Sequence, residues 1–95
     1  MARRIAVSKS AHADLRRLRA FIARESEVSA GLAIERLMNG VRLLRDMPHL
    51  GVAVRPPFRH FVLPHGKSGY VVRYRVTKAE IVITRIWHGR ENRPR

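Results

Sequence analysis

The sequence contains no cysteine among its 95 residues. This absence excludes a disulfide framework and any metal site built on thiolates, and it is typical of proteins that work in a reducing cytosol. Long apolar runs are also missing, since no stretch approaches the roughly 20 residues that a membrane-spanning helix needs. The basic N-terminus has no apolar run behind it, so we expect no signal peptide and a cytoplasmic location.

Acidic residues are scarce as well. Only 7 Asp and Glu oppose 20 Lys and Arg, which gives a formal net charge of +13. The charge is uneven, because residues 1–54 carry a net +5 and residues 55–95 carry +8. Such a chain attracts polyanions or an acidic protein, and we expect the C-terminal half to be the binding half. The alternative is a basic surface that is simply solvated.

Apolar residues make up 45% of the chain, which is ordinary for a folded domain. The length fits one domain with a modest core. We therefore expect a single domain over residues 1–95, in which residues 88–95 form a polar C-terminal tail.

The first half of the chain has helical periodicity after a short strand over residues 4–8. A helix is expected over residues 9–25, capped by Ser8 or Ser10. Asp14 would lie in its first turn, where a negative charge interacts favourably with the helix dipole. The apolar stripe of this helix comprises Ala11, Leu15, Leu18 and Ile22.

A second helix is expected over residues 29–46, capped by Ser26 or Ser29 and ended by Pro48 and Gly51. Its apolar stripe comprises Ala30, Ile34, Leu37, Val41 and Leu44. The short polar break between the two helices predicts an antiparallel hairpin.

The second half has the period of strands, over residues 58–63, 70–76 and 80–87, with a loop at 64–69. In the clearest strand, alternation separates two faces. One face carries Tyr70, Val72, Tyr74 and Val76, and the other carries Val71, Arg73 and Arg75. The sequence thus predicts an α+β fold in the order β-α-α-β-β-β: an N-terminal strand, a helical hairpin on one sheet face, and a three-stranded antiparallel meander. We interpret Tyr70 and Tyr74 as core residues.

The pattern gives no sign of a cofactor or a metal. The five histidines are scattered, and no pair has the i, i+4 spacing of a zinc-binding helix. Phosphate-binding glycine motifs and a nucleophile elbow are absent from the sequence.

One dense constellation, Arg85-Ile86-Trp87-His88-Gly89-Arg90, lies where the last strand meets the tail. A histidine beside arginines could act as a base near neutral pH, and the arginines could hold a phosphate. The same residues could instead grip acidic side chains of a partner. In the third interpretation, Trp87 is a core anchor and His88 merely ends the strand.

Arg59, Arg73 and Arg75 form a second candidate group. Arg73 and Arg75 alternate outward on the clearest strand, which favours a groove for a polyanion or an acidic helix over a solvated sheet face.

In their order along the chain, these residues resemble the RelE/ParE toxins of type II toxin–antitoxin systems. The resemblance covers nearly the whole chain and rests on Ala13-Asp14-Leu15, Leu18, Ile22, Pro48, Gly51, Arg59, Tyr74-Arg75-Val76 and Ile83-Thr84-Arg85-Ile86-Trp87-His88-Gly89-Arg90. The family fold has the element order expected above, and the resemblance implies a small acidic antitoxin as partner.

The resemblance also implies one of two activities. RelE-like members cut mRNA on the ribosome, and ParE-like members poison DNA gyrase. The nucleases typically carry an arginine three residues before the Tyr of the Tyr-x-Val strand, and this chain has Val71 there. We therefore expect a ParE-like inhibitor that binds gyrase without chemistry. Its partner-binding residues would be Arg59, Arg73, Arg75, Arg85, Trp87, His88 and Arg90.

The alternative is a ribosome-dependent endoribonuclease, in which His88, Arg90 and Arg73 would be catalytic. A plain nucleic-acid-binding domain is less favoured, because the sequence has neither a helix-turn-helix pattern nor an interleaved aromatic surface.

Overall fold

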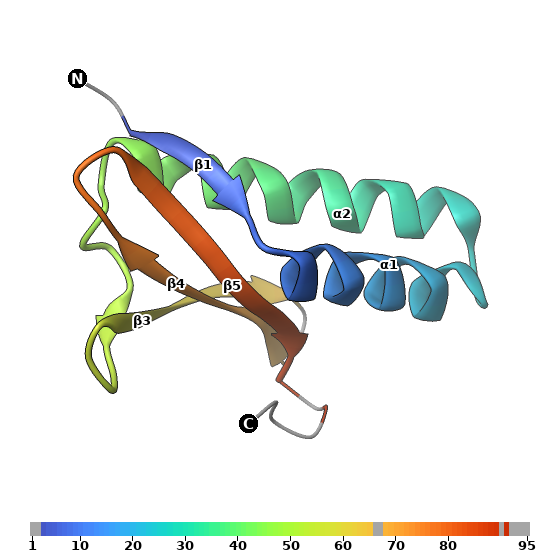
Figure 1. Cartoon of the computed structure of the whole chain (residues 1–95). Coiled ribbons are helices and arrows are strands. Elements are labelled where there is room, and N and C mark those ends of the chain that lie inside the picture. The colour runs from blue at the N-terminus through green and yellow to red at the C-terminus, as the bar shows by residue number, and fades with distance from the viewer. Residues whose placement is uncertain (1–2, 66–67, 90, 92–95) are drawn as a thin grey trace.

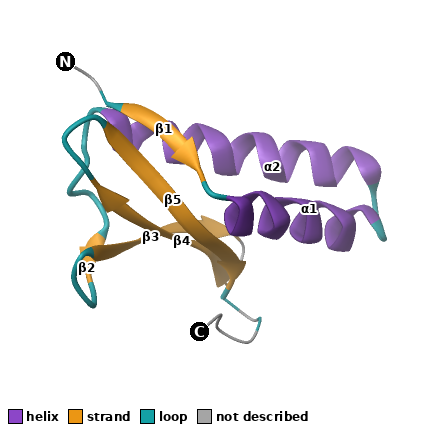
Figure 2. Cartoon of the chain, in the orientation of Figure 1, coloured by secondary structure: helices purple, strands orange, loops and turns teal. Residues whose placement is uncertain are grey.

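The computed structural model describes residues 3–65, 68–89 and 91. Its element order is the expected one with a short extra strand (Figure 1). The elements are β1 (Arg4–Val7), α1 (Lys9–Ala23), α2 (Glu27–Arg42), the 3-10 helix η1 (Leu43–Arg45), β2 (Val52–Ala53), β3 (Phe58–His65), β4 (Ser68–Val76) and β5 (Glu80–His88). The extra strand is β2, visible in Figure 2.

Serine hydroxyls cap the N-termini of both α-helices. Ser8 accepts a hydrogen bond from the Ala11 N–H at 3.1 Å, and Ser26 accepts one from the Ser29 N–H at 3.1 Å. Each bond satisfies a main-chain donor that the first helical turn leaves without an intrahelical acceptor. The two helices lie side by side as an antiparallel hairpin (Figure 1). None of the described helices is long and apolar enough to cross a membrane.

The sheet has the strand order β1-β5-β4-β3-β2, in which β1 runs parallel to β5 and the other neighbours are antiparallel. The hairpin of β3 and β4 is tighter than expected, since the expected loop at 64–69 is mostly strand and pairing continues to His65↔Ser68. Residues 66–67 lie outside the described part.

A bulge in β5 changes which side chains face the helices. Arg73 pairs with Arg85 but Tyr74 pairs with Ile83, so Thr84 is an extra residue in β5. The Thr84 hydroxyl donates to the Arg73 carbonyl at 3.1 Å, which fixes the irregularity. As a result, Ile83 and Ile86 both reach the core, although simple alternation would place them on opposite faces.

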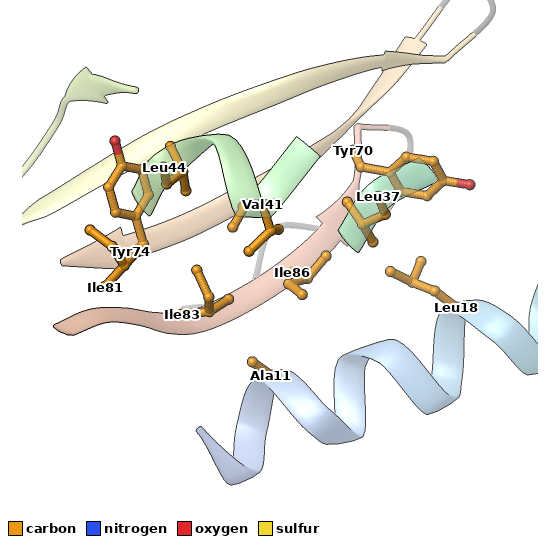
Figure 3. Close-up of a cluster of buried hydrophobic side chains, with 11 residues drawn as sticks. Ala11, Leu18, Leu37, Val41, Leu44, Tyr70, Tyr74, Ile81, Ile83 and Ile86 are labelled. Atoms are coloured by element: carbon orange, nitrogen blue, oxygen red, sulfur yellow. The ribbon is translucent and has the colours of Figure 1, made fainter. Parts of the chain in front are cut away.

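The core lies between the helical hairpin and one face of the sheet (Figure 3). It confirms both apolar stripes and the core positions of Tyr70 and Tyr74. Its buried members are Ala11, Leu18, Leu37, Val41, Leu44, Tyr70, Val72, Tyr74, Ile81, Ile83 and Ile86. The Tyr74 hydroxyl donates to the Pro48 carbonyl at 2.7 Å and accepts from the Gly51 N–H at 2.9 Å, which ties the 48–51 loop to the sheet.

Candidate functional site

The outer sheet face, on which neither helix packs, carries a cluster of one arginine and two aromatic rings. The Arg73 guanidinium carbon lies 5.1 Å from the centre of the Trp87 ring, a cation–π distance. Arg73 also donates its Nε–H to Nε2 of His60 at 3.1 Å, and the His60 ring meets Trp87 edge-on at 5.2 Å. Trp87 is only 2% exposed, so an incoming partner meets Arg73 rather than the indole.

The sheet register separates the three arginines of the second candidate group. Arg75 pairs with Phe58 and Arg73 pairs with His60, so both point to the outer face. Arg59 pairs with Tyr74, whose side chain is in the core, so Arg59 points to the other face. There it donates to the Gly51 carbonyl at 2.6 Å, which holds the 49–51 loop.

Arg85 pairs with the outward-facing Arg73, but its guanidinium does not stay on the outer face: it binds a buried carboxylate of α1. It donates its Nε–H to Oδ2 of Asp14 at 2.9 Å and its Nη2–H to Oδ1 at 3.1 Å. Asp14 also accepts from the Ile86 N–H at 2.8 Å and from Nη1 of Arg17 at 2.6 Å. With a side chain 3% exposed, Asp14 is a buried charge that four hydrogen bonds compensate.

Asp14 is therefore not the first-turn residue that the sequence suggested. The first turn of α1 holds no acidic residue, and Asp14 lies one turn further along, on the buried face. A signal was present in the sequence: Asp14 falls three residues after Ala11 and four before Leu18, within the apolar stripe. A charged residue at such a position indicates a buried partner.

The network continues to the end of the described chain. Arg17 forms a bidentate pair with Glu91, with distances of 3.1 Å from Nε and 3.2 Å from Nη2. Glu91 also accepts from the His88 N–H at 2.7 Å. Arg17 in turn donates to the Ile86 carbonyl at 3.3 Å. The start of the C-terminal tail is thereby held against α1.

The network shifts the pKa values of its members. Burial acts to raise the pKa of Asp14, but the hydrogen bonds from Arg85, the Ile86 N–H and Arg17 outweigh it and hold that pKa below its usual value. For Glu91, burial likewise acts against hydrogen bonds from Arg17 and the His88 N–H, and its pKa is also lowered. Both carboxylates are charged at neutral pH.

His88 points to the helix side of the sheet, away from Arg73. It pairs with Tyr70, and the two rings meet edge-on at 5.3 Å. Both residues line a groove of about 560 Å³ beside the C-terminal end of α1. The other lining residues are Leu18, Phe21, Ile22, Arg24 and Glu25. Phe21 is 67% exposed there, so the groove offers an apolar wall to a partner.

The structure therefore divides the candidate residues into four places. Arg73, Arg75 and Trp87 lie on the outer face; Arg85 is bound to Asp14; Arg59 supports a loop; His88 lines the groove. Arg90 lies outside the described residues. The sequence interpretation missed three residues: His60 meets Arg73 through the strand register, and Arg17 and Glu91 meet because the chain after β5 packs against α1. In the part that the structure describes, no three His, Asp or Glu side chains are grouped to hold a metal ion.

Comparison with known proteins identifies the family. Residues 5–93 match the family model described as the ParE toxin of the type II toxin–antitoxin system parDE. Two toxins of Caulobacter vibrioides are similar in sequence. Toxin RelE1 is 34% identical over 94% of this chain and 96% of its own, and toxin RelE3 is 31% identical over 87% and 90%.

The fold has a solved counterpart as well. A chain of the structure titled "Chromosomal ParDE TA system from P. aeruginosa" superposes with a TM-score of 0.73 and covers 92% of this chain and 96% of its own. Its sequence identity is 21%, so this likeness concerns the fold alone. From the match over residues 5–93, we conclude that the chain belongs to the ParE toxin family of type II toxin–antitoxin systems.

Proposed function

We propose that this toxin inhibits DNA gyrase by binding it in the cytoplasm, and that a small acidic antitoxin neutralises it. The observation that carries the first part is that the sheet separates His88 from Arg73. His88 pairs with Tyr70 on the helix side, whereas Arg73 pairs with His60 and covers Trp87 on the outer side.

A ribonuclease needs its base and its phosphate-binding groups around one scissile phosphate, within hydrogen-bond reach. Side chains on opposite faces of a sheet do not meet that condition. Val71 adds to the argument, because it lies on the outer face opposite Trp87, at the position where the nuclease members of the RelE/ParE family typically carry an arginine. Valine can neither donate a hydrogen bond nor carry charge.

The second candidate function is a RelE-like endoribonuclease, and His60 is the observation in its favour. Its Nε2 accepts a hydrogen bond from Arg73, so an imidazole and a guanidinium do meet on the outer face. The two Caulobacter relatives are named RelE1 and RelE3, which is a second reason to test for endoribonuclease activity.

A gyrase assay with matched arginine variants tests the binding proposal. We expect Arg73→Gln to weaken the inhibition of supercoiling by about thirtyfold or more, because loss of one charged contact in a desolvated interface costs about 2 kcal/mol or more. Arg16→Gln, an exposed arginine of α1, is the control and should inhibit as well as the wild type. Equal inhibition by both variants would mean that Arg73 on the outer face does not contact gyrase.

The acidic antitoxin is proposed from charge and shape together. The chain carries +13, and the groove beside His88 combines the exposed Phe21 with Arg24. An amphipathic segment with an apolar anchor and carboxylates would complement both features. Co-expression with the product of the adjacent reading frame should relieve growth inhibition and give a stable complex. A toxin that is harmless alone and purifies alone would contradict this proposal.

A further inference from the structure

The edge of the sheet at β1 has main-chain groups that point outward. Among the described strands, β1 pairs with β5 alone and is the last in the sheet order. The N–H groups of Arg4 and Ser8 donate to the carbonyls of Ala79 and Ile83, each at 3.0 Å. Because main-chain groups alternate in direction along a strand, the N–H and C=O groups of Ile5 and Val7 point away from β5.

A groove with a basic rim adjoins this edge. Its volume is about 410 Å³, and it lies between β1, the end of α2 and η1. Ile5 and Met38 line its apolar part above the buried Val41, and Arg4, Arg42 and Arg45 form its rim. Arg45 donates its Nε–H to the Arg3 carbonyl at 3.3 Å, which holds its guanidinium beside the start of β1.

β5 continues past the end of β1, from Thr84 to His88, and its edge there differs from the edge of β1. There, side chains bind the outward main-chain groups: Ser8 donates to the Thr84 carbonyl, Asp14 accepts from the Ile86 N–H, Arg17 donates to the Ile86 carbonyl, and Glu91 accepts from the His88 N–H. This edge is closed to strand addition. The edge of β1 is flanked instead by the apolar groove and its arginines.

We propose that an extended acidic segment of a partner protein adds to the edge of β1. Its main chain would pair with Ile5 and Val7, an apolar side chain would enter the groove, and carboxylates would bind Arg42 and Arg45. The choice of partner rests on the proposed function, in which the partner is the acidic antitoxin. Nucleic acid suits the arginines but not the edge, because phosphates only accept hydrogen bonds and cannot satisfy the outward carbonyls.

Hydrogen exchange measured residue by residue tests the main-chain part. In the free toxin, the amides of Ile5 and Val7 should exchange faster than that of Ala6, whose N–H faces β5. In the complex with the co-expressed antitoxin, the Ile5 and Val7 amides should slow at least tenfold. A stable complex in which both amides exchange as in the free toxin would overturn the inference and leave the proposed function standing.

Charge reversal tests the rim independently. Arg42→Glu with Arg45→Glu should weaken antitoxin binding at least tenfold more than the control pair Arg16→Glu with Arg36→Glu, which makes the same charge change on exposed helical positions. Melting curves verify that both double variants fold. Equal losses in the two pairs would overturn the inference. The inference would also be overturned if the Arg42 and Arg45 double variant lost binding to a short DNA duplex but still bound the antitoxin as the wild type does. Failure to form any complex would overturn both neutralisation and this inference.

Discussion

The carboxylate of Asp14 accepts a hydrogen bond from the Ile86 main-chain N–H at 2.8 Å, across 72 positions of sequence. Ile86 lies on β5 beyond the end of β1, where no neighbouring strand supplies an acceptor among the described residues. Asp14 therefore takes the place of a strand at that point. Through Arg85 and Arg17, it also joins α1 to the sheet and to the start of the tail.

Removal of this carboxylate should be costly. Asp14→Ala leaves two arginines without their buried partner and the Ile86 N–H without an acceptor, so we expect the free energy of unfolding to fall by about 3 kcal/mol. Asp46→Ala, which removes an exposed carboxylate just after η1, is the control and should change it by less than about 0.5 kcal/mol. Urea denaturation measures both, and similar losses would contradict a special role for Asp14.

Acid should weaken the fold through the same network. The pKa of Asp14 is lowered from 3.8 and that of Glu91 from 4.5, so the unfolded chain binds protons at a higher pH than the folded chain does. Their contribution to stability is complete above about pH 5 and is lost as the pH falls through the lowered values. Stability measured from pH 6 to pH 2.5 should fall more steeply in the wild type than in Asp14→Asn. Parallel curves would refute this assignment.

The helix faces are tested by three leucines. Leu18→Ala and Leu37→Ala should each lower the free energy of unfolding by about 2–4 kcal/mol, because both side chains are buried against the sheet. Leu32→Ala provides a matched control, since Leu32 is 62% exposed on α2. A melting temperature unchanged within about 1 °C in either core variant would mean that the faces are assigned wrongly.

Two glycines should respond to alanine in opposite directions. At Gly51 an added Cβ would lie 2.7 Å from the Tyr74 ring and 2.8 Å from the His60 carbonyl, so Gly51→Ala should destabilise by at least about 1–3 kcal/mol. At Gly31, inside α2, nothing lies within 4 Å of the added atom. Gly31→Ala should therefore stabilise by about 0.5–1 kcal/mol. Thermal unfolding of both variants gives the comparison, and the same sign at both sites would contradict it.

The helices and the faces of β4 could be predicted from the sequence, because periodicity over many residues reports burial directly. The alternation from Tyr70 to Val76 placed Arg73 and Arg75 outward, and the register agrees. The same periodicity gave the order of the elements, the family resemblance agreed with that order, and the family itself is confirmed.

The details of the site could not be predicted in the same way. In β5, Ile83 and Trp87 have the same parity, and only the extra residue Thr84 puts Trp87 on the outer face while Ile83 stays in the core. Likewise, the separation of Arg59 from Arg73 follows from strand register, which depends on pairing between segments. β2 has two residues, too few for periodicity to reveal.

The most direct test of the proposed activity applies two assays to one preparation of toxin. Purified gyrase is assayed for supercoiling and for trapped cleavage complexes, and programmed ribosomes are assayed for cuts in the message at the A site. Because the sheet separates His88 from Arg73, we predict inhibited gyrase and uncut message. Codon-dependent cuts that disappear in His88→Ala or His60→Ala, with gyrase unaffected, would contradict the account and favour the endoribonuclease.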